Sequence, residues 1–354
     1  MTRGLKPIKS GLAVLVLGLL SPVFALAQEW ETVTPGGDTA CSDGSPYRFF
    51  VHRGDPSKLL IEFEGGGACW SGTTCEADIY NKTVTSDPET ARQTGQLQGI
   101  YDRANPANPL KDFTHVYIPY CTGDLHWGNA ATTYTGLSGQ PYVVQHKGAT
   151  NATSALNWAG ANVPAPAQVV VAGCSAGGYG AALWSAKIGQ AYPGARMVEL
   201  ADSAAGVVPE GFFGTTLTNW NVTDAWPSFI PGLTLDKVDP KTLTLPKLYT
   251  AVAGFYPTAA FSQFNNRMDS IQIFFYSLTK GSISITDPFD WSAKMVSNVD
   301  QISQANPNFR AYLAPGTEHC IINRASFYTQ TVSGKKFSDW VTTLLKGGDP
   351  GQVR

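Results

Sequence analysis

The sequence has few charged residues and almost no excess of either sign. Lys and Arg number 25, and Asp and Glu number 27, among 354 residues, so the formal net charge is -2. Because nucleic-acid-binding proteins carry a basic surface, this balance argues against nucleic acid as a partner. The sequence also lacks internal repeats and low-complexity tracts. With 43% hydrophobic residues, the chain can bury a large core, and we expect a monomer.

Long apolar runs are missing except near the N-terminus. There, Arg3, Lys6 and Lys9 precede an apolar segment at 11–20 and an Ala-Leu-Ala triplet at 25–27. This order is typical of a cleavable signal peptide, and the apolar segment is short for a bilayer span. We therefore predict a signal peptide at 1–27, a single domain at 28–354 and no membrane span after cleavage. The mature protein would be secreted or periplasmic.

Cysteine is scarce, but its number is even. An even set in an exported chain predicts disulfides, and Cys69 and Cys75 are close enough in sequence to close a small loop. Metal binding is the alternative, but no further Cys or His stands near this pair at the spacing of a zinc site. We expect no metal and no organic cofactor. The six residues are Cys41, Cys69, Cys75, Cys121, Cys174 and Cys320.

Short β-branched or aromatic runs alternate with segments of helical character. The runs predict strands at 59–63, 114–118, 168–172, 196–200, 271–277 and 310–313. Helices are expected at 150–159, 180–190 and 337–345. This alternation predicts an α/β fold with a mostly parallel central sheet and helices on both faces. Residues 209–257 have no clean period and are expected to form an irregular cap or lid.

One serine stands in a strand, turn and helix context. An apolar run at 168–172 leads into Gly-Cys-Ser-Ala-Gly-Gly at 173–178, and small residues suited to a helix follow. In this G-x-S-x-G pattern the glycines permit a sharp turn that lifts the serine hydroxyl clear of the sheet. Ser175 is therefore the candidate nucleophile. The amide of Ala176, in the first turn of the helix, can face a developing oxyanion.

A serine nucleophile needs a base, and His319 alone among five histidines follows Ser175. It stands in a loop after a late apolar run, which is where hydrolases of this kind carry their base. The acid that orients the base should lie between the two. Asp202 and Asp269 are the strongest choices, and local sequence does not decide between them.

Three consecutive glycines, Gly65, Gly66 and Gly67, come shortly after the early predicted strand at 59–63. Backbone amides in such a turn can approach a substrate closely, as the second half of an oxyanion hole requires. A phosphate-binding loop is the alternative, but its glycine and lysine patterns are absent.

These motifs together resemble the pectin acetylesterase family, a family of the α/β-hydrolase type that includes the animal Wnt deacylase Notum. The resemblance rests on Glu-Gly-Gly-Gly at 64–67, the serine motif at 173–178, Asp-Ser-Ile-Gln at 269–272 and His-Cys at 319–320. It covers the chain from about Thr39 to the end. The predicted domain at 28–354 would then be a pectin acetylesterase-like hydrolase domain.

The resemblance also implies roles for residues. It assigns the acid to Asp269 and leaves Asp202 as a structural residue or a residue of the site wall. It places the oxyanion donors on the amides of Gly66, Gly67 and Ala176. It pairs Cys69 with Cys75 and Cys41 with Cys121, while Cys174 and Cys320 are left either bridged or free. The sequence departs from the family's pattern after the glycines, because Ala68 stands before Cys69 and Trp70 stands after it. Three residues at the site rim are possible substrate contacts: Trp70, His126 and Trp127.

We therefore expect a secreted serine carboxylesterase with a Ser175-His319-Asp269 triad. The resemblance implies acetylated polysaccharide of the pectin type as the substrate. An alternative is a Notum-like esterase for longer acyl or lipid esters. A non-catalytic carbohydrate-binding relative and an amidase with the same triad are further alternatives.

Overall fold

The computed structural model describes residues 1–2, 30–85 and 87–354. The predicted signal peptide at 1–27 lies outside the described residues, apart from its first two. Within the described part of the chain, no helix is both long enough and apolar enough to cross a membrane.

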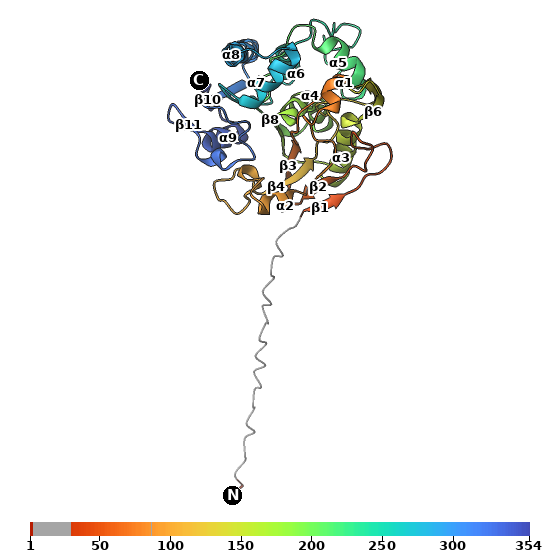
Figure 1. Cartoon of the computed structure of the whole chain (residues 1–354). Helices are drawn as coiled ribbons and strands as arrows, with labels where there is room; N and C mark the ends of the chain where they lie inside the picture. Colours follow the sequence, from red (N-terminus) through yellow and green to blue (C-terminus); the bar gives the residue numbers. More distant parts are fainter. Residues whose placement is uncertain (3–29, 86) are drawn as a thin grey trace.

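An eight-stranded sheet runs through the centre of the molecule (Figure 1). Its strands lie in the order β1-β2-β4-β3-β7-β8-β9-β10. The strands from β4 to β10 pair in parallel, whereas β2 pairs antiparallel with β1 and with β4. The bounds are β1 (Glu31–Val33), β2 (Phe49–His52), β3 (Asp55–Phe63), β4 (Phe113–Ile118), β7 (Gln168–Cys174), β8 (Arg196–Asp202), β9 (Phe261–Asn266) and β10 (Phe309–Ala314).

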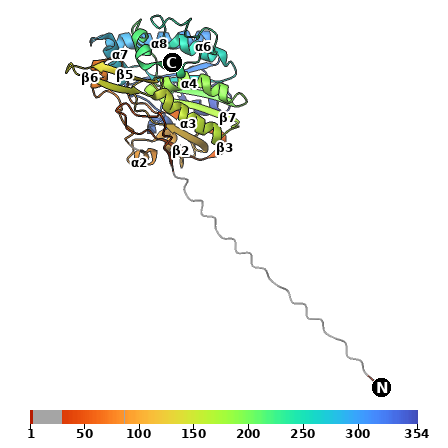
Figure 2. The ribbon, with the colours of Figure 1, turned by 90° about the vertical axis from the view of Figure 1, so that its right-hand side faces the viewer.

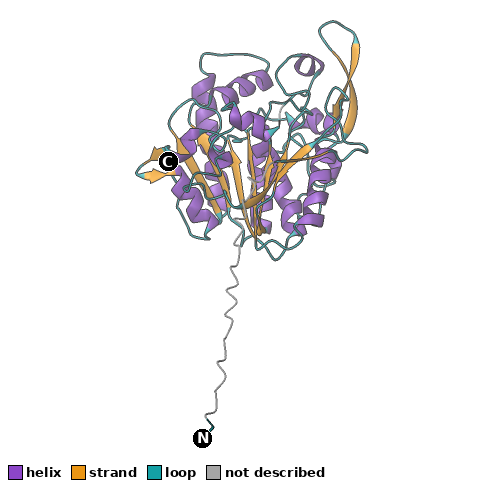
Figure 3. Ribbon diagram, turned by 90° about the horizontal axis from the view of Figure 1, so that it is seen from below, coloured by secondary structure: helices purple, strands orange, loops and turns teal. Residues whose placement is uncertain are grey.

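Helices cover both faces of this sheet (Figure 3), which confirms the expected fold class. Side chains from four helices form the larger core on one face: α3 (Gly148–Asn162), α4 (Ala176–Ala191), α6 (Leu245–Phe255) and α8 (Asp287–Ala305). The opposite face packs against α9 (Phe337–Leu345) and the 3-10 turns η1 (Gly99–Tyr101) and η3 (Ala325–Tyr328).

The remaining elements are short or lie in connections. A hairpin of β5 (Ala130–Thr135) and β6 (Pro141–His146) lies at one side of the molecule (Figure 2), apart from the central sheet. The others are α1 (Gly72–Glu76), α2 (Pro88–Gln93), α5 (Phe213–Trp220), η2 (Val222–Asp224), α7 (Ser270–Lys280), β11 (Thr331–Val332) and β12 (Lys335–Lys336).

Five of the six expected strands are confirmed, and the prediction for 271–277 is wrong. This segment belongs to α7, and β9 lies directly before it. The prediction missed three of the sheet's strands, β1, β2 and β9. Asp269 caps the helix, because its side chain accepts hydrogen bonds from the amides of Ile271 and Gln272. The buried residues Gln272 and Tyr276 are four apart, which is helical spacing. The aromatic and β-branched composition of the segment suggested a strand. The N-cap of Asp269 and the burial of one helical face stabilise a helix instead.

The segment at 209–257, expected as a cap or lid, has two parts. Its first part contains α5, whose aromatic residues Phe213 and Trp220 are buried. These two residues line one cavity with Ser175 and Ser203, which directly follow β7 and β8, so this part lies beside the ends of those strands. The last part is α6, which belongs to the main core.

Candidate active site

Ser175 occupies the turn between β7 and α4. Its φ is +56°, which is rare for a residue with a side chain. A Cβ atom on Gly173 would lie 2.1 Å from the carbonyl oxygen of Gly177, and one on Gly177 would lie 1.9 Å from the carbonyl oxygen of Phe63. Only glycine fits at both positions, because the turn presses against β3. The tight turn presents Ser175 at the carboxyl end of a central strand.

His319 lies against Asp269. The Nδ1 atom of His319 is 2.9 Å from each carboxylate oxygen of Asp269, whose side chain is fully buried. The other ring nitrogen, Nε2, is buried and has no hydrogen-bond partner, although His319 lines the same cavity as Ser175. An imidazole held at Nδ1 with Nε2 uncommitted is the arrangement that a general base requires.

Gln272 holds Asp269 from the side of α7. Its amide nitrogen donates to Oδ2 of Asp269 and to Oδ1 of Asn265, each at 3.0 Å. Its amide oxygen accepts from the backbone amide of Ala205 at 2.9 Å. The carboxylate is therefore kept in one orientation by groups from α7 and β9 and from the loop after β8. The sequence motif Asp-Ser-Ile-Gln contains this residue, but its role depends on the fold.

Asp202, the aspartate that local sequence left as an alternative, does not pair with His319. It is fully buried at the end of β8 and accepts hydrogen bonds from the amides of Ile321 and Ile322 at 2.6 and 2.8 Å. The neighbouring Ser203 hydroxyl accepts from the amide of Cys320 at 2.9 Å. Burial raises the pKa of Asp202 to about 6. Asp202 thus holds the loop that carries His319, as a structural residue would.

The three amides expected in the oxyanion hole all border Ser175. Ala176 is the first residue of α4, so its amide has no partner within the helix. Gly67 has a φ of +79°, and a Cβ atom there would lie 2.0 Å from the carbonyl oxygen of Ile79. Gly67 and Ala176 line one cavity next to Ser175, and Gly66 and Gly67 line another.

An apolar cavity of about 70 Å³ opens beside Ser175 and His319. None of the described residues that line it is Asp, Glu, Lys or Arg. At roughly 10–15 Å³ for each water-sized position, it holds about five to seven such positions, which is more than an acetyl group needs. Its walls come mainly from α5, α7 and nearby loops and include Trp70, Phe212, Phe213, Trp220, Phe275 and Trp291.

The pectinacetylesterase family model matches residues 32–224, more than half of the chain. The chain belongs to this family. This match confirms the resemblance drawn from the motifs. At the level of the family, it also confirms the expectation of a carboxylic ester hydrolase.

Relatives of the family agree with this assignment. The palmitoleoyl-protein carboxylesterase NOTUM of Schmidtea mediterranea is 32% identical over 106 residues, which is 27% of this chain and 19% of that protein. Notum2 of Xenopus laevis, with the same enzyme name, is 30% identical over 100 residues, 28% of this chain and 21% of that protein. The chain thus matches about a fifth of the length of these relatives.

A solved structure extends the likeness of fold to nearly the whole chain. The Wnt deacylase Notum from Drosophila superposes with a TM-score of 0.63 over 90% of this chain and 93% of that chain, at 14% sequence identity. At this identity the likeness concerns the fold alone.

Of the three possible substrate contacts, the structure places only Trp70 at the apolar cavity. Trp127 is fully buried and donates from Nε1 to the carbonyl oxygen of Tyr179 at 3.2 Å. His126 is 1% exposed, and its Nε2 lies 2.9 Å from the carbonyl oxygen of Glu64. Burial lowers the pKa of His126 to about 4, so the ring is neutral at pH 7 and donates to that oxygen. His126 and Trp127 are therefore packing residues that support the glycine turn and α4.

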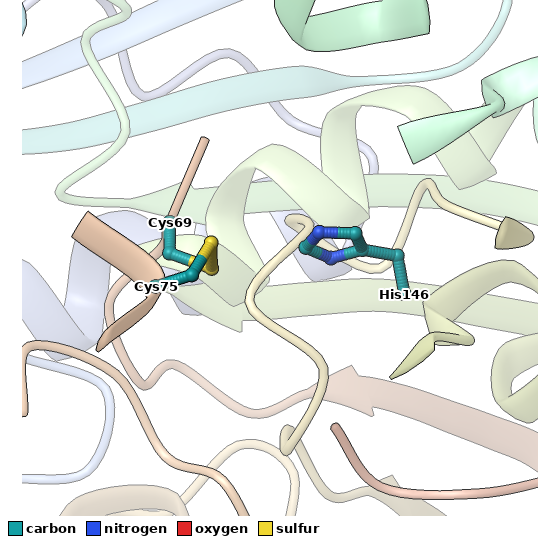
Figure 4. A group of neighbouring side chains, drawn as sticks. All are labelled: Cys69, Cys75 and His146. Carbon is teal, nitrogen blue, oxygen red and sulfur yellow. A yellow bond between two sulfur atoms is a disulfide. The ribbon is translucent and has the colours of Figure 1, made fainter. Parts of the chain in front are cut away.

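Three disulfides are present: Cys41–Cys121, Cys69–Cys75 and Cys174–Cys320. The third joins the residue before the candidate nucleophile to the residue after the candidate base, a pairing that the sequence left open. Two groups of metal-ligand type, Cys69-Cys75-His146 and Cys174-His319-Cys320, include these sulfurs. In Figure 4 the sulfurs of Cys69 and Cys75 are bonded to each other. Both ring nitrogens of His146 have hydrogen-bond partners, Tyr134 and Thr122. The cluster of Cys69, Cys75 and His146 therefore has a structural role.

Proposed function

We propose that this chain is an exported serine carboxylesterase and that the acyl group of its ester substrate binds in the apolar cavity beside Ser175. The observation that carries the proposal is the position of Ser175 and His319 on the wall of one apolar cavity, with Asp269 at Nδ1 of the histidine. Membership of the pectinacetylesterase family supports ester hydrolysis as the reaction.

The proposed reaction is acyl transfer in two steps. The Ser175 hydroxyl attacks the ester carbonyl while Nε2 of His319 takes its proton, and Asp269 stabilises the imidazolium. The amides of Gly66, Gly67 and Ala176 stabilise the oxyanion. The imidazolium gives its proton to the departing alcohol, which leaves an acyl enzyme. Water, activated by His319, then releases the carboxylic acid and restores Ser175.

The apolar cavity favours an acyl chain longer than acetyl. Its volume exceeds what an acetyl group fills, and its aromatic walls have no charged group to bind a polar acyl part. Removal of acetyl groups from pectin remains the second candidate, because the family match favours it.

The decisive experiment is a chain-length series. The mature protein is assayed for kcat/KM on nitrophenyl acetate, butyrate, hexanoate, octanoate and palmitate, with Ser175→Ala as the control. We expect an optimum between butyrate and octanoate, and loss of all activity in the variant. An optimum at acetate would favour the deacetylase. Activity that survives in Ser175→Ala would refute the proposed nucleophile.

Export is part of the same proposal. Disulfides form and persist in oxidising compartments, and three are present among the described residues. N-terminal sequencing of the protein recovered outside the cytoplasm would test the signal peptide, and we expect it to begin at Gln28.

A further inference from the structure

Exposed apolar side chains are concentrated around α7 and the loop that follows it. Apart from Met1, ten large apolar side chains are exposed in the part of the chain that the structure describes, and five of them lie between residues 271 and 289. Apolar side chains gathered in one exposed area mark an interaction site, whereas single scattered ones do not. We call the five the apolar strip: Ile271, Phe274, Ile283, Ile285 and Phe289.

The strip begins on the solvent face of α7. Ile271 and Phe274 are three residues apart, and the half-buried Leu278 follows four residues later, so the three side chains share one face of the helix. Gln272 and Tyr276 lie on the other face and are buried. The helix therefore presents an apolar edge to the outside although its buried face already supplies the packing that it needs.

A brace holds the loop between α7 and α8. The buried carboxylate of Asp287 accepts hydrogen bonds from the backbone amide of Ser284 at 2.9 Å and from the hydroxyl of Ser277 at 2.6 Å, and it pairs with Lys280 at 2.5 Å. These bonds tie the loop to the last turns of α7. The two loop isoleucines are 80% and 94% exposed in this braced conformation, and Phe289 lies beside them in the first turn of α8.

The strip continues into the apolar cavity beside Ser175. Ile271 belongs to both, because it lines the cavity and is 41% exposed. The ring centre of Phe274 is 5.4 Å from that of Phe275, which lines the cavity, and Phe275 is 6.5 Å from Trp70 on the same wall. An acyl chain that approaches along the strip therefore meets apolar side chains from the surface to the nucleophile.

The charges around the strip cancel. Residues 270–294, all of which the structure describes, contain four charged side chains, and these form two ion pairs, Lys280–Asp287 and Lys294–Asp290. Anionic membranes and acidic proteins are attracted by cations without an acidic partner, which this segment does not offer. A neutral lipid surface is bound through buried apolar area instead, and apolar area is what the strip provides.

We propose that the apolar strip docks on the surface of a neutral lipid aggregate, so that the enzyme takes its acyl ester from a lipid phase. This inference rests on the proposed function and adds the physical state of its substrate. Docking buries the strip and turns the mouth of the apolar cavity towards the lipid. An acyl chain then reaches Ser175 without crossing water.

The first test measures binding. The mature protein is sedimented with phosphatidylcholine vesicles in low and in high salt. We expect binding in both, and at least about tenfold weaker binding by the double variant Ile283→Ser, Ile285→Ser, because it removes apolar area from the contact. Leu137→Ser, at a site that is 83% exposed on the β5–β6 hairpin, is the matched control and should bind like the wild type. No binding by the wild type, or binding only to anionic vesicles in low salt, would overturn the proposal.

The second test compares dissolved with aggregated substrate. As the concentration of tributyrin passes its solubility limit, the wild-type rate should rise by at least about fivefold above the value reached in solution, because the enzyme gathers at the new surface. The double variant should lose this rise, and its kcat/KM on dissolved nitrophenyl butyrate should stay within about twofold of the wild type. A wild-type rate without the rise would overturn the proposal. So would an equal loss on the dissolved ester, because the loop would then support the site itself.

A second copy of the chain is the other partner that suits an exposed apolar strip. Sedimentation velocity without lipid separates the two cases. We expect a monomer, and a dimer that the double variant dissociates would overturn the lipid assignment.

Failure of this inference differs from failure of the proposed function. If the protein hydrolyses no dissolved nitrophenyl ester, the proposed function fails. If it hydrolyses them through Ser175 but neither binds vesicles nor responds to aggregated tributyrin, only the lipid docking fails.

Discussion

Two cavities meet at Ser175, one of about 70 Å³ and one of about 330 Å³, and they differ in the elements that build their walls. The smaller one has aromatic walls from α5, α7 and neighbouring loops, and the larger one has carboxyl and hydroxyl groups from β3, β4 and η1. The alternation of β3 explains part of this difference. Leu59, Ile61 and Phe63 face one core and Leu60 the other, so Glu62 falls on the face of Leu60.

Under the proposed function, this contrast means that the aromatic wall binds the acyl group, while Ser175 and His319, which line both cavities, carry out the chemistry on every ester. Changes at these two border residues should affect every ester, whereas changes in the aromatic wall should affect only the acyl preference. The predictions below begin at the border.

Replacing Asp269 and Asp202 one at a time by asparagine should distinguish a direct role in catalysis from a structural role in holding the loop of His319. Asp269→Asn should lower kcat about 10⁴-fold on every ester, because it removes the charge that stabilises the imidazolium. Asp202→Asn should lower kcat less than about tenfold, because its amide oxygen can still accept from Ile321 and Ile322. Steady-state kinetics on nitrophenyl hexanoate measure both. Equal losses in the two variants would contradict the assignment.

Removing the Cys174–Cys320 disulfide, beside Ser175 and His319, should lower the free energy of unfolding more than removing the Cys69–Cys75 disulfide. Cys174–Cys320 spans 146 residues and Cys69–Cys75 spans 6. On loop-closure entropy, double alanine variants should lose about 5 and about 2 kcal/mol of unfolding free energy. The border variant should also lose activity, because the bond holds the loop of His319. Urea unfolding with parallel assays tests this. A border variant with full activity would show that Asp202 and Ser203 hold the loop alone.

A bulky residue in the apolar wall should affect only the acyl side. Val208→Trp fills part of the cavity, so kcat/KM for nitrophenyl octanoate should fall about tenfold or more, while acetate changes little. Trp substituted for the exposed Leu137, far along the chain from the site, is the matched control. If kcat/KM falls equally for the acetate and the octanoate esters, the cavity does not hold the acyl group.

The carboxyl groups of Glu62 and Glu64 should make stability depend on pH. Their pKa values are about 8 and 7 in the folded protein, above the ordinary 4.5. The folded state therefore keeps protons that the unfolded state has released, so stability falls as pH rises from about 5 to about 8, which includes most of the window from 6.5 to 8.5. Glu199, buried elsewhere with a pKa of about 8, acts in the same direction. The buried His126 and His146, with pKa values near 4, are neutral in this window.

We expect the Tm to fall by about 5 °C between pH 6.5 and 8.5. Glu62→Gln should make this fall shallower, because the glutamine does not titrate. Glu210→Gln, at an exposed position, should leave the slope unchanged. Differential scanning calorimetry measures all three, and a Tm that rises with pH in this window would contradict the pKa values.

Much of the fold could be predicted, because buried parallel strands are continuous apolar runs. The exception, 271–277, shows the limit of that signal. Ile271 and Phe274 are about 41% exposed, whereas Gln272 and Tyr276 are buried. The apolar composition of this segment therefore does not mark a buried strand. It lies on a helix because Asp269, which contacts His319, also caps it.

The candidate nucleophile was determined by sequence alone, because a strand, a tight glycine turn and a helix are all specified within a short segment. The partner of His319 was not determined by sequence. Asp202 ends β8 and Asp269 follows β9, and only the parallel order β8-β9-β10 with the cap on α7 brings Asp269 to Nδ1 of His319. The walls of the two cavities were likewise decided by tertiary structure, because their residues are brought together by burial and strand alternation rather than by proximity along the chain.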